Sequence, residues 1–314
     1  MSARLQAGVL FLAALTLAAC AAPQAKTLLR SPPSDLPPRV ELVHVPFFPQ
    51  EQFQCGPAAL ATVLSAAGMR TAPESLVPLI YLPARQGSLQ VELLAATRRQ
   101  GLLAYQLAPR LDAVLTEVAA GNPVLVLQNL ALEWVPRWHY AVVVGYDLVR
   151  KEIVLRSGST ARAVLSLHTF EHTWKRSKHW AMLALPAGQT PRTAAEIPFV
   201  EAALALEQGG QLPAAKSAYS AALERWPDDL TAAIGSGNVA YALGDLAGAK
   251  AALRVAADRH PDSVAVLNNL ALVLSELKQH RQALETAQRA ATLGGSLHAE
   301  AEKTLEQIRA AAAH

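Results

Sequence analysis

The second half of the chain repeats itself every 34 residues, and no other feature restricts the possible folds as strongly. Alanine recurs at this spacing in two positions of the repeat: Ala215, Ala249 and Ala283, and then Ala222, Ala256 and Ala290. A unit of this size buries its apolar face only against a neighbouring copy, so a fixed period predicts a stack of helical units. A plain helical bundle is the alternative, but it does not explain two positions that keep the same register. We therefore expect an all-α repeat domain over residues 195–314.

The details within the period resemble tetratricopeptide repeats. Gly210 and Gly244 stand where paired helices turn, and Pro227 and Pro261 close the first two repeats. The resemblance implies three repeats in a short curved solenoid, closed by a C-terminal capping helix over Ser296–Ala312. Its concave groove would bind a protein or peptide partner, or the domain would serve only as a spacer. The sequence does not decide between these two roles.

The first twenty residues have the pattern of an export signal. A short start with Arg4 leads into the apolar run Gly8–Ala19, which is too short to span a bilayer of about 30 Å comfortably. It ends in Leu17–Cys20 (LAAC), which resembles the lipobox of bacterial lipoproteins, where the cysteine thiolate accepts a diacylglycerol before cleavage. We expect a signal peptide over residues 1–19 and lipidation of Cys20. The alternatives are an ordinary secretory signal and a buried first helix.

The lipobox has consequences for location and for thiol chemistry. The acyl chains would hold the protein at a membrane. The resemblance to lipoproteins of Gram-negative bacteria implies sorting to the outer membrane, facing the periplasm, because the residue two after Cys20 is Ala22 and not aspartate. Residues 20–38 contain five prolines and predict an extended, helix-poor tether. Because lipidation consumes Cys20, Cys55 would be the only remaining thiol and no disulfide could form.

The first domain, residues 39–187, has the pattern of an α+β fold, and residues 188–194 form a short linker after it. Helical segments precede an antiparallel hairpin and a final strand. The expected helices are Ala58–Ala67, Ser88–Gln100, Pro109–Ala120 and Ser166–Arg176, and the expected strands are Val40–Phe48, Pro123–Gln128, His139–Asp147, Glu152–Arg156 and Trp180–Leu185.

Cys55 and His139 are the candidate catalytic pair. Cys55 precedes Gly56-Pro57 at the start of an apolar helix, where the positive end of the helix dipole favours a thiolate. His139 opens a later apolar strand and would take the thiol proton and return it to the leaving amine. The alternatives are a small buried core cysteine and an ordinary strand histidine. The helix-start position and the absence of another thiol favour the catalytic interpretation.

The segments around these two residues resemble bacteriocin-processing papain-like cysteine peptidases, which include the leader-cleaving domains of peptide exporters. The resemblance rests on QxxxxCGPAALATVL from Gln50 and on WHYAVVVGYD from Trp138, and it covers about Val43–Leu185. It implies a nucleophilic Cys55, a basic His139, and Gln50 as the side-chain amide that helps to hold the oxyanion. Gln52 and Gln54 lie close enough for that last assignment to shift.

The chain departs from the family pattern at the third catalytic position. The family places an aspartate at the end of the strand after the histidine hairpin, whereas this chain reads Val154-Leu155-Arg156-Ser157-Gly158. Asp147 is nearer to His139 in sequence but has the context of a hairpin turn. A backbone carbonyl or an amide such as Asn129 would then orient the ring, or activity would be weak, since losing the orienting acid costs orders of magnitude in rate.

Other ligands and cofactors find little support. His168–His172 (HTFEH) fits the inverted zinc-peptidase pattern, but such short patterns recur by chance and no third ligand follows on a suitable helix. We expect no metal and no cofactor. The formal charge of +3 and the absence of dense Lys/Arg runs argue against nucleic acid as a partner.

The sequence therefore predicts a lipid-anchored extracytoplasmic cysteine peptidase that hydrolyses a peptide or protein substrate, with repeats that bind a protein partner. Two alternatives stay open: a catalytically weak or inactive peptide-binding lipoprotein with the same fold, and another acyl-transfer reaction, such as amide transfer, on the same pair.

Overall fold

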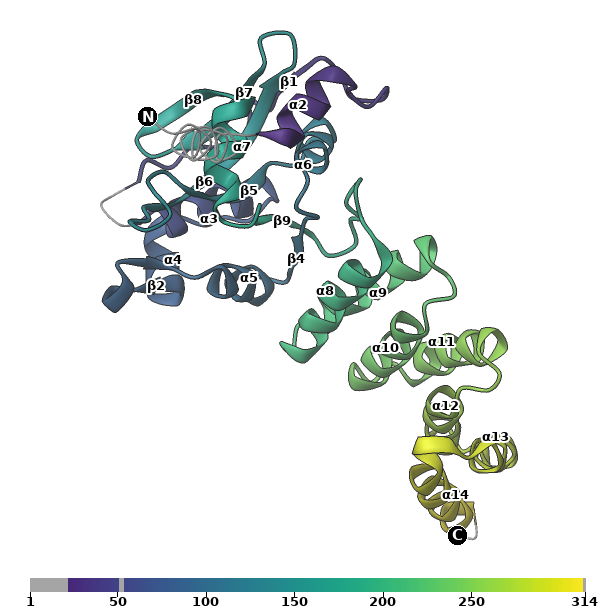
Figure 1. Cartoon of the computed structure of the whole chain (residues 1–314). Coiled ribbons are helices and arrows are strands. Elements are labelled where there is room, and N and C mark those ends of the chain that lie inside the picture. The colour runs from purple at the N-terminus through teal and green to yellow at the C-terminus, as the bar shows by residue number, and fades with distance from the viewer. Residues whose placement is uncertain (1–21, 51–53, 313–314) are drawn as a thin grey trace, which may run out of the picture. The chain divides into compact units, whose positions relative to one another are not determined.

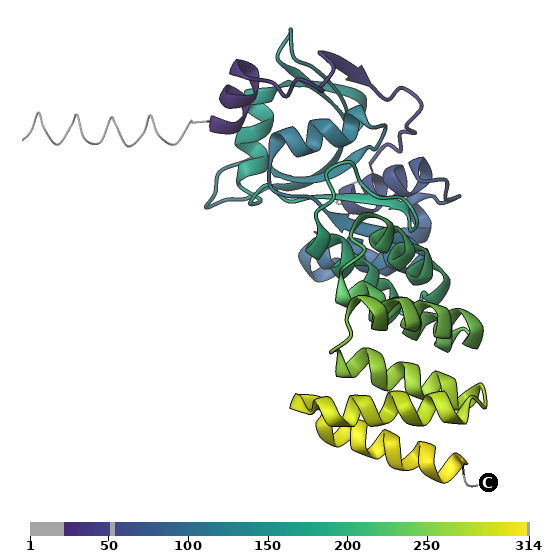
Figure 2. The same cartoon turned by 90° about the vertical axis from the view of Figure 1, so that its right-hand side faces the viewer.

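The structure, a computed structural model, describes residues 22–50 and 54–312 and divides into two compact units (Figures 1 and 2). The first unit holds the described residues up to Ala96 together with Gln106–Ala184 and Pro191–Thr193. The second holds Thr97–Tyr105, Leu185–Thr190 and the chain from Ala194 onward. The short segment Thr97–Tyr105, which the sequence assigns to the first domain, groups with the repeats. Its Tyr105 ring packs against Phe199, and its hydroxyl accepts a hydrogen bond from the N–H of Ala195.

An antiparallel sheet forms the frame of the first unit. Its strands run in the order β9 (Ala181–Pro186), β5 (Val124–Asn129), β6 (Trp138–Asp147), β7 (Glu152–Ser157) and β8 (Thr160–Ser166), and β1 (Arg39–Glu41) pairs with the end of β6. Every residue of β5 is buried, as expected of a central strand covered on both faces. The sequence predicted β5, β6, β7 and β9 but missed β8.

Helices cover this sheet. α3 (Cys55–Ala66) packs against β5 and β6, whereas α7 (Leu167–Lys175) packs against β5, β7 and β8 and buries Phe170 and Trp174. α6 (Leu111–Ala119) contacts β5 and β6. The remaining elements before β4 (Leu102–Gln106) are α4 (Pro73–Ile80), β2 (Tyr81–Leu82), the short 3-10 helix η1 (Pro83–Arg85), β3 (Gly87–Ser88) and α5 (Gln90–Arg99).

The prediction that residues 20–38 form an extended, helix-poor tether is wrong for its middle part. Pro23–Arg30 forms helix α2, with Pro23 at the first turn, where a missing N–H costs nothing. The buried carboxylate of Glu171 on α7 accepts hydrogen bonds from the backbone N–H groups of Gln24 at 3.0 Å and Ala25 at 2.6 Å. A negative charge at a helix N-terminus stabilises the helix, so α2 is fixed to the domain by a residue far away in sequence.

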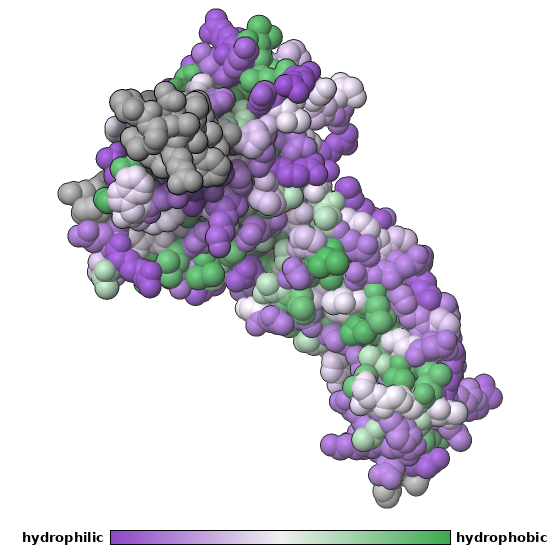
Figure 3. Space-filling model, viewed as in Figure 1, coloured by the Kyte–Doolittle hydropathy of each residue, from purple (hydrophilic) through white to green (hydrophobic). Residues whose placement is uncertain are grey.

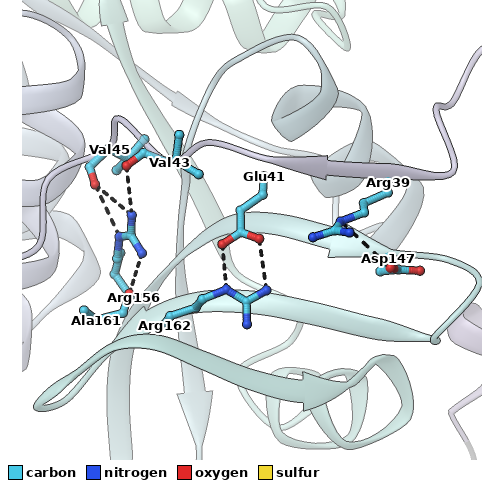
Figure 4. Close-up of polar contacts among 8 residues, drawn as sticks. All are labelled: Arg39, Glu41, Val43, Val45, Asp147, Arg156, Ala161 and Arg162. Atoms are coloured by element: carbon cyan, nitrogen blue, oxygen red, sulfur yellow. Dashed lines mark hydrogen bonds and ion pairs between the residues drawn. The ribbon is translucent and has the colours of Figure 1, made fainter.

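The expected strand Val40–Phe48 is also shorter than predicted, because it ends at Glu41. Beyond that point the Arg156 guanidinium donates hydrogen bonds to the carbonyl oxygens of Val43 and Val45, which therefore need no strand partner (Figure 4). Arg162 on β8 holds Glu41 through two hydrogen bonds of 2.7 and 3.0 Å, and this bidentate pair ties β1 to the hairpin (Figure 4).

Gly145 allows β1 to cross β6 closely. It lies at a register shift between β6 and β7 and pairs with Glu41. A Cβ atom at this position would lie 2.7 Å from the carbonyl oxygen of Val40, which is backbone and cannot move aside without shifting the strand. Glycine is therefore required for this pairing.

The repeat region is a run of helices with the predicted period. The first helices of the successive pairs start at Glu196, Leu230, Val264 and His298, and the second helices start at Leu212, Leu246 and His280. In order they are α8 (Glu196–Gln208), α9 (Leu212–Arg225), α10 (Leu230–Ala242), α11 (Leu246–Arg259), α12 (Val264–Glu276), α13 (His280–Leu293) and, after the short η2 (Gly295–Leu297), α14 (His298–Ala312). The six alanines that define the period are all buried, which confirms the all-α repeat prediction.

Candidate active site

The nucleophile candidate occupies the start of a helix, as the sequence predicted. Cys55 is the first residue of α3, is partly buried, and carries a free thiol. Gly56 follows it against β3, and a Cβ atom at Gly56 would lie 2.4 Å from the Ser88 hydroxyl oxygen. The absence of a side chain at Gly56 therefore lets the helix start approach β3 closely. The backbone of Tyr140, the residue after His139, makes a hydrogen bond with Cys55, so α3 and β6 meet at the candidate pair.

The electrostatics of Cys55 differ from the sequence expectation. Burial raises the pKa of the thiol above its ordinary value, although backbone hydrogen bonds with Tyr140, with Gly56 and with its own backbone lower it in part. The free-energy cost of removing the thiolate from water is larger here than the stabilisation that the helix N-terminus provides. In the free protein Cys55 is therefore held as a neutral thiol and not as the thiolate that the helix dipole alone predicts.

His139 lies near the start of β6 with one ring nitrogen already engaged. Its Nε2 lies 2.8 Å from the hydroxyl oxygen of Ser157 at the end of β7. Burial, and secondarily the positive charge of Arg137, lower the pKa of His139 to about 4. The imidazole is thus neutral near pH 7, which is the form that can accept a proton. When Nε2–H donates to Ser157, Nδ1 is left as the proton acceptor.

Ser157 is the site residue that sequence reasoning missed. It stands at the end of the strand after the histidine hairpin, where the resemblance implies an aspartate, and its hydroxyl is the group that meets the ring. Asn129 does not take this role, because its side-chain oxygen accepts from the N–H groups of Ala131 and Arg137. Asp147 pairs instead with Arg39 at the opposite end of β6. The position was visible in the sequence, but a serine there gives no signal by itself.

Gln50 reaches the same strand. Its side-chain amide donates to the carbonyl oxygen of Tyr140 at 3.3 Å, and its backbone N–H donates to the carbonyl oxygen of Gly158, next to Ser157, at 3.1 Å. A primary amide has two N–H donors, and contacts among residues 22–50 and 54–312 account for one of them, so the second can serve a substrate oxygen. Gln52 lies outside the described residues, and Gln54 is the residue at the N-cap of α3.

The acid and the second histidine of the zinc pattern HTFEH make structural hydrogen bonds in this fold. Glu171, its central acid, accepts the N-terminal hydrogen bonds of α2, and the His172 ring lies 2.8 Å from the Arg176 guanidinium. Within residues 22–50 and 54–312, no group of three or more His, Cys, Asp or Glu side chains is arranged to hold a metal. Cys20, the predicted lipidation site, lies outside the described residues.

A cleft of about 760 Å³ opens beside Cys55. Its walls come from the segment 85–90, the start of β6 and the turn 176–178 that follows α7. They include Tyr140, whose hydroxyl donates to the carbonyl oxygen of Ser88. A cavity of this size accommodates several residues of an extended peptide or a small molecule. Cys55 lines this cleft, whereas His139, Ser157 and Gln50 are not among its lining residues. A thiol, a neutral imidazole with a hydrogen-bonded partner, and a side-chain amide are the types of group that thiol acyl transfer uses.

Comparison with known proteins identifies both parts of the chain. Residues 42–182 match the Peptidase_C39 like family, and residues 200–263 and 234–298 match the tetratricopeptide repeat family. The chain therefore contains a C39-like peptidase domain followed by tetratricopeptide repeats, as the sequence motifs predicted. No curated protein sequence matches the chain.

Solved structures resemble each part separately. A C39-like peptidase from Bacillus anthracis is 18% identical with a TM-score of 0.41, and the match covers 49% of this chain and 99% of that one. The peptidase domain of Streptococcus ComA, a bifunctional ABC transporter of a quorum-sensing pathway, is 21% identical with a TM-score of 0.37, covering 46% and 99%. For the repeats, the peptide-binding TPR protein YrrB is 28% identical with a TM-score of 0.34, covering 37% and 59%.

Residues 22–50 and 54–312 contain no helix whose length and apolar character would let it cross a membrane.

Proposed function

We propose that the first unit is a cysteine peptidase in which Cys55 is the nucleophile and His139 the general base. The observation that carries the proposal is the hydrogen bond between His139 Nε2 and the Ser157 hydroxyl, 2.8 Å long, at a strand position next to the Cys55 helix. This bond fixes the orientation of the ring, and in the tautomer whose Nε2–H donates to Ser157, Nδ1 is free to accept the thiol proton. A neutral imidazole held in one orientation, on a strand that packs against the Cys55 helix, can serve as the general base for the thiol.

The pKa shifts decide how the reaction would start. With the pKa of Cys55 raised and that of His139 lowered to about 4, the resting pair is a neutral thiol and a neutral imidazole. His139 Nδ1 takes the thiol proton as Cys55 Sγ attacks the substrate carbonyl carbon, and the resulting oxyanion accepts the spare Gln50 amide N–H. The imidazolium then protonates the leaving amine, which releases one product and leaves a thioester on Cys55. Water, deprotonated by His139, hydrolyses that thioester.

A thiol-reactive peptide probe tests this mechanism in the full chain. We expect rapid labelling of the wild-type protein, none of Cys55→Ala, and labelling of His139→Ala at the rate of a free model thiol. Mass spectrometry of probe and substrate peptides then separates covalent modification from cleavage. Equal labelling rates in the wild-type and His139→Ala proteins would exclude His139 as the base.

A second candidate function, peptide binding without cleavage, has its own support. A serine where an acid would stabilise the imidazolium, together with the raised pKa of Cys55, disfavours the charged intermediate state. Under this alternative the Cys55→Ala protein binds peptides as tightly as the wild type, and neither cleaves them. Detection of a thioester intermediate or of cleaved product would rule it out.

We also propose that the protein is a lipoprotein of the cell envelope. The support is the LAAC sequence that ends in Cys20 after an apolar run, with Ala22 favouring the outer membrane. Growth of an expressing Gram-negative strain with a labelled fatty acid tests it: the label should appear on the wild-type protein and be lost in Cys20→Ser. Retention of the label in that variant would contradict the assignment. Separation of inner and outer membranes tests the location.

The repeats are proposed to bind a protein or peptide partner. Exposed large apolar side chains occur along them, including Tyr241, Leu243 and Leu272, and hydrophobic surface is visible among the polar residues of the repeats in Figure 3. Such exposure in a repeat domain is typical of a binding surface. Crosslinking of the envelope with the full chain and with a chain that ends at residue 194 distinguishes partners that need the repeats from those that do not.

A further inference from the structure

The cleft beside Cys55 is lined by positive charge. Four basic residues reach its walls from three separate segments: Arg85, Arg137, Arg176 and Lys178. No aspartate or glutamate is among the described residues that line it. A concave surface with charge of one sign concentrates ligands of the opposite sign, since the low-dielectric walls focus the field.

These cations form no ion pair with an acidic side chain among the described residues. Among the described residues, Arg85, Arg137 and Lys178 have no acidic side chain within ion-pair distance, whereas Arg39, Arg110 and Arg162 of the same unit each have one. Arg176 differs from these three residues because the fold uses its guanidinium: it donates to the carbonyl oxygens of Asn129 and Ala131 and thereby holds the loop after β5. The nearby acid Glu133 is not part of the cleft wall.

The backbone that presents two of these cations is held in an unfavourable conformation. Of the five described non-glycine residues with positive φ, two line the cleft: Gln86 next to Arg85, with φ of 48°, and Lys178, with φ of 57°. The left-handed region costs an L-residue roughly 1–2 kcal/mol. The buried Ser177 hydroxyl helps to hold the second turn: it lies within hydrogen-bond distance of the carbonyl oxygens of Leu127 and Trp174 and can donate its hydrogen to either. Strain of this kind clusters at ligand-binding sites.

The cleft also has apolar contacts to offer. Trp138, half exposed at 50%, stands among its lining residues with Leu89, Leu127 and Pro136. A ligand that satisfies the whole wall therefore carries carboxylates and apolar side chains together. An inorganic polyanion such as polyphosphate offers no apolar groups for Trp138, and a flat lipid surface does not enter a cavity.

From these observations we propose that the cleft selects acidic peptide segments, with Glu or Asp side chains placed against Arg85 and Lys178 and apolar side chains against Trp138. The inference rests on the proposed peptidase function and supplies its substrate class. It also gives Arg137, close to His139 in sequence, a role: its charge attracts the substrate and adds to the effect of burial, which lowers the pKa of His139.

Binding to the full chain in the Cys55→Ala background tests the proposal without requiring cleavage. The probe is a short fluorescein-labelled peptide of alternating Glu and Leu, compared by fluorescence anisotropy with the same peptide carrying Gln for Glu. We expect the Glu peptide to bind at least about tenfold more tightly at low salt and to lose this advantage at high salt. Arg85→Glu and Lys178→Glu should each weaken it about fivefold.

Arg150→Glu is the matched control. This exposed arginine lies in the turn after β6, at the opposite end of a ten-residue strand from Trp138. It makes the same change in net charge, and we expect no effect on binding of the Glu peptide. Arg137 is left unchanged because its charge also acts on His139.

Three results would overturn the proposal: equal affinity for the Glu and Gln peptides, equal weakening by Arg150→Glu, or binding to anionic phosphatidylglycerol vesicles that depends on Arg85 and Lys178 while the peptide does not bind. Failure of the proposed peptidase function gives a different result from failure of the acidic-peptide proposal. In the first case the Cys55→Ala protein binds the Glu peptide in a charge-dependent way, but the wild type does not cleave it.

Discussion

Replacing Ser157 tests whether its hydroxyl orients the catalytic ring. The Ser157→Ala protein lacks the 2.8 Å partner of His139 Nε2. A net hydrogen bond is worth about 1 kcal/mol, so we expect kcat/KM to fall about fivefold. Ser157→Asp places a carboxylate at the same ring nitrogen. A carboxylate stabilises the imidazolium, so it should raise the pKa of His139 from about 4 by roughly 1 to 3.

Two measurements read out these changes independently. NMR titration of the full chain, with the His139 signal assigned by its loss in His139→Gln, gives the pKa without requiring activity. The pH profile of kcat/KM should show its acid limb near 4 in the wild type and at higher pH in Ser157→Asp. Ser159→Ala, in the exposed turn two residues later, is the control. An unchanged His139 pKa in Ser157→Asp, or equal rates in Ser157→Ala and Ser159→Ala, would refute the orienting role.

Three further predictions concern stability and are measured by urea or thermal unfolding. Glu171→Gln keeps the shape but loses the charge that accepts two N–H groups of α2, and should lower the free energy of unfolding by about 2 kcal/mol; no change would mean that α2 is held by packing alone. Gly145→Ala forces a Cβ to 2.7 Å from the Val40 carbonyl oxygen and should cost about 1–3 kcal/mol, unless β1 detaches freely. Folding lowers the pKa of His139 from 6.5 to about 4, so the free energy of unfolding is highest above pH 6.5, where the ring is neutral in both states, and falls by up to about 3 kcal/mol as the pH drops toward 4. The free energy of unfolding of His139→Gln should depend less on pH in this range. An identical slope in both proteins would contradict the prediction.

The sequence was informative where function depends on local pattern. The apolar run after Cys55 and the apolar run after His139 are each visible directly in the sequence, and the 34-residue register fixes the starts of seven helices. β8 was missed because most of its residues are exposed and its sequence, TARAVLS, lacks a strongly apolar face.

The remaining errors come from contacts between distant residues. Local composition around Pro23 suggests an extended chain, because the acid that caps α2 is more than 140 residues away. The thiol of Cys55 is another example: its helix position predicts a lowered pKa, and only the packing of α3 against the sheet reveals that burial reverses the direction. The role of Ser157 depends on the register between β6 and β7, which a single sequence does not determine.

The docking of α2 sets the length of the free segment between Cys20 and the first unit. Only three residue steps separate Cys20 from Pro23, a reach of about 10 Å, whereas a fully extended chain to Arg39 would allow roughly 60 Å. If Cys20 carries the lipid, the contacts that dock α2 determine how far the peptidase domain can lie from the bilayer; these are the Glu171 carboxylate, the Gln24 hydrogen bonds to Pro109 and Leu111, and the buried Ala25 and Leu28. Releasing α2 would lengthen the tether several-fold, and with it the distance at which a substrate can be reached.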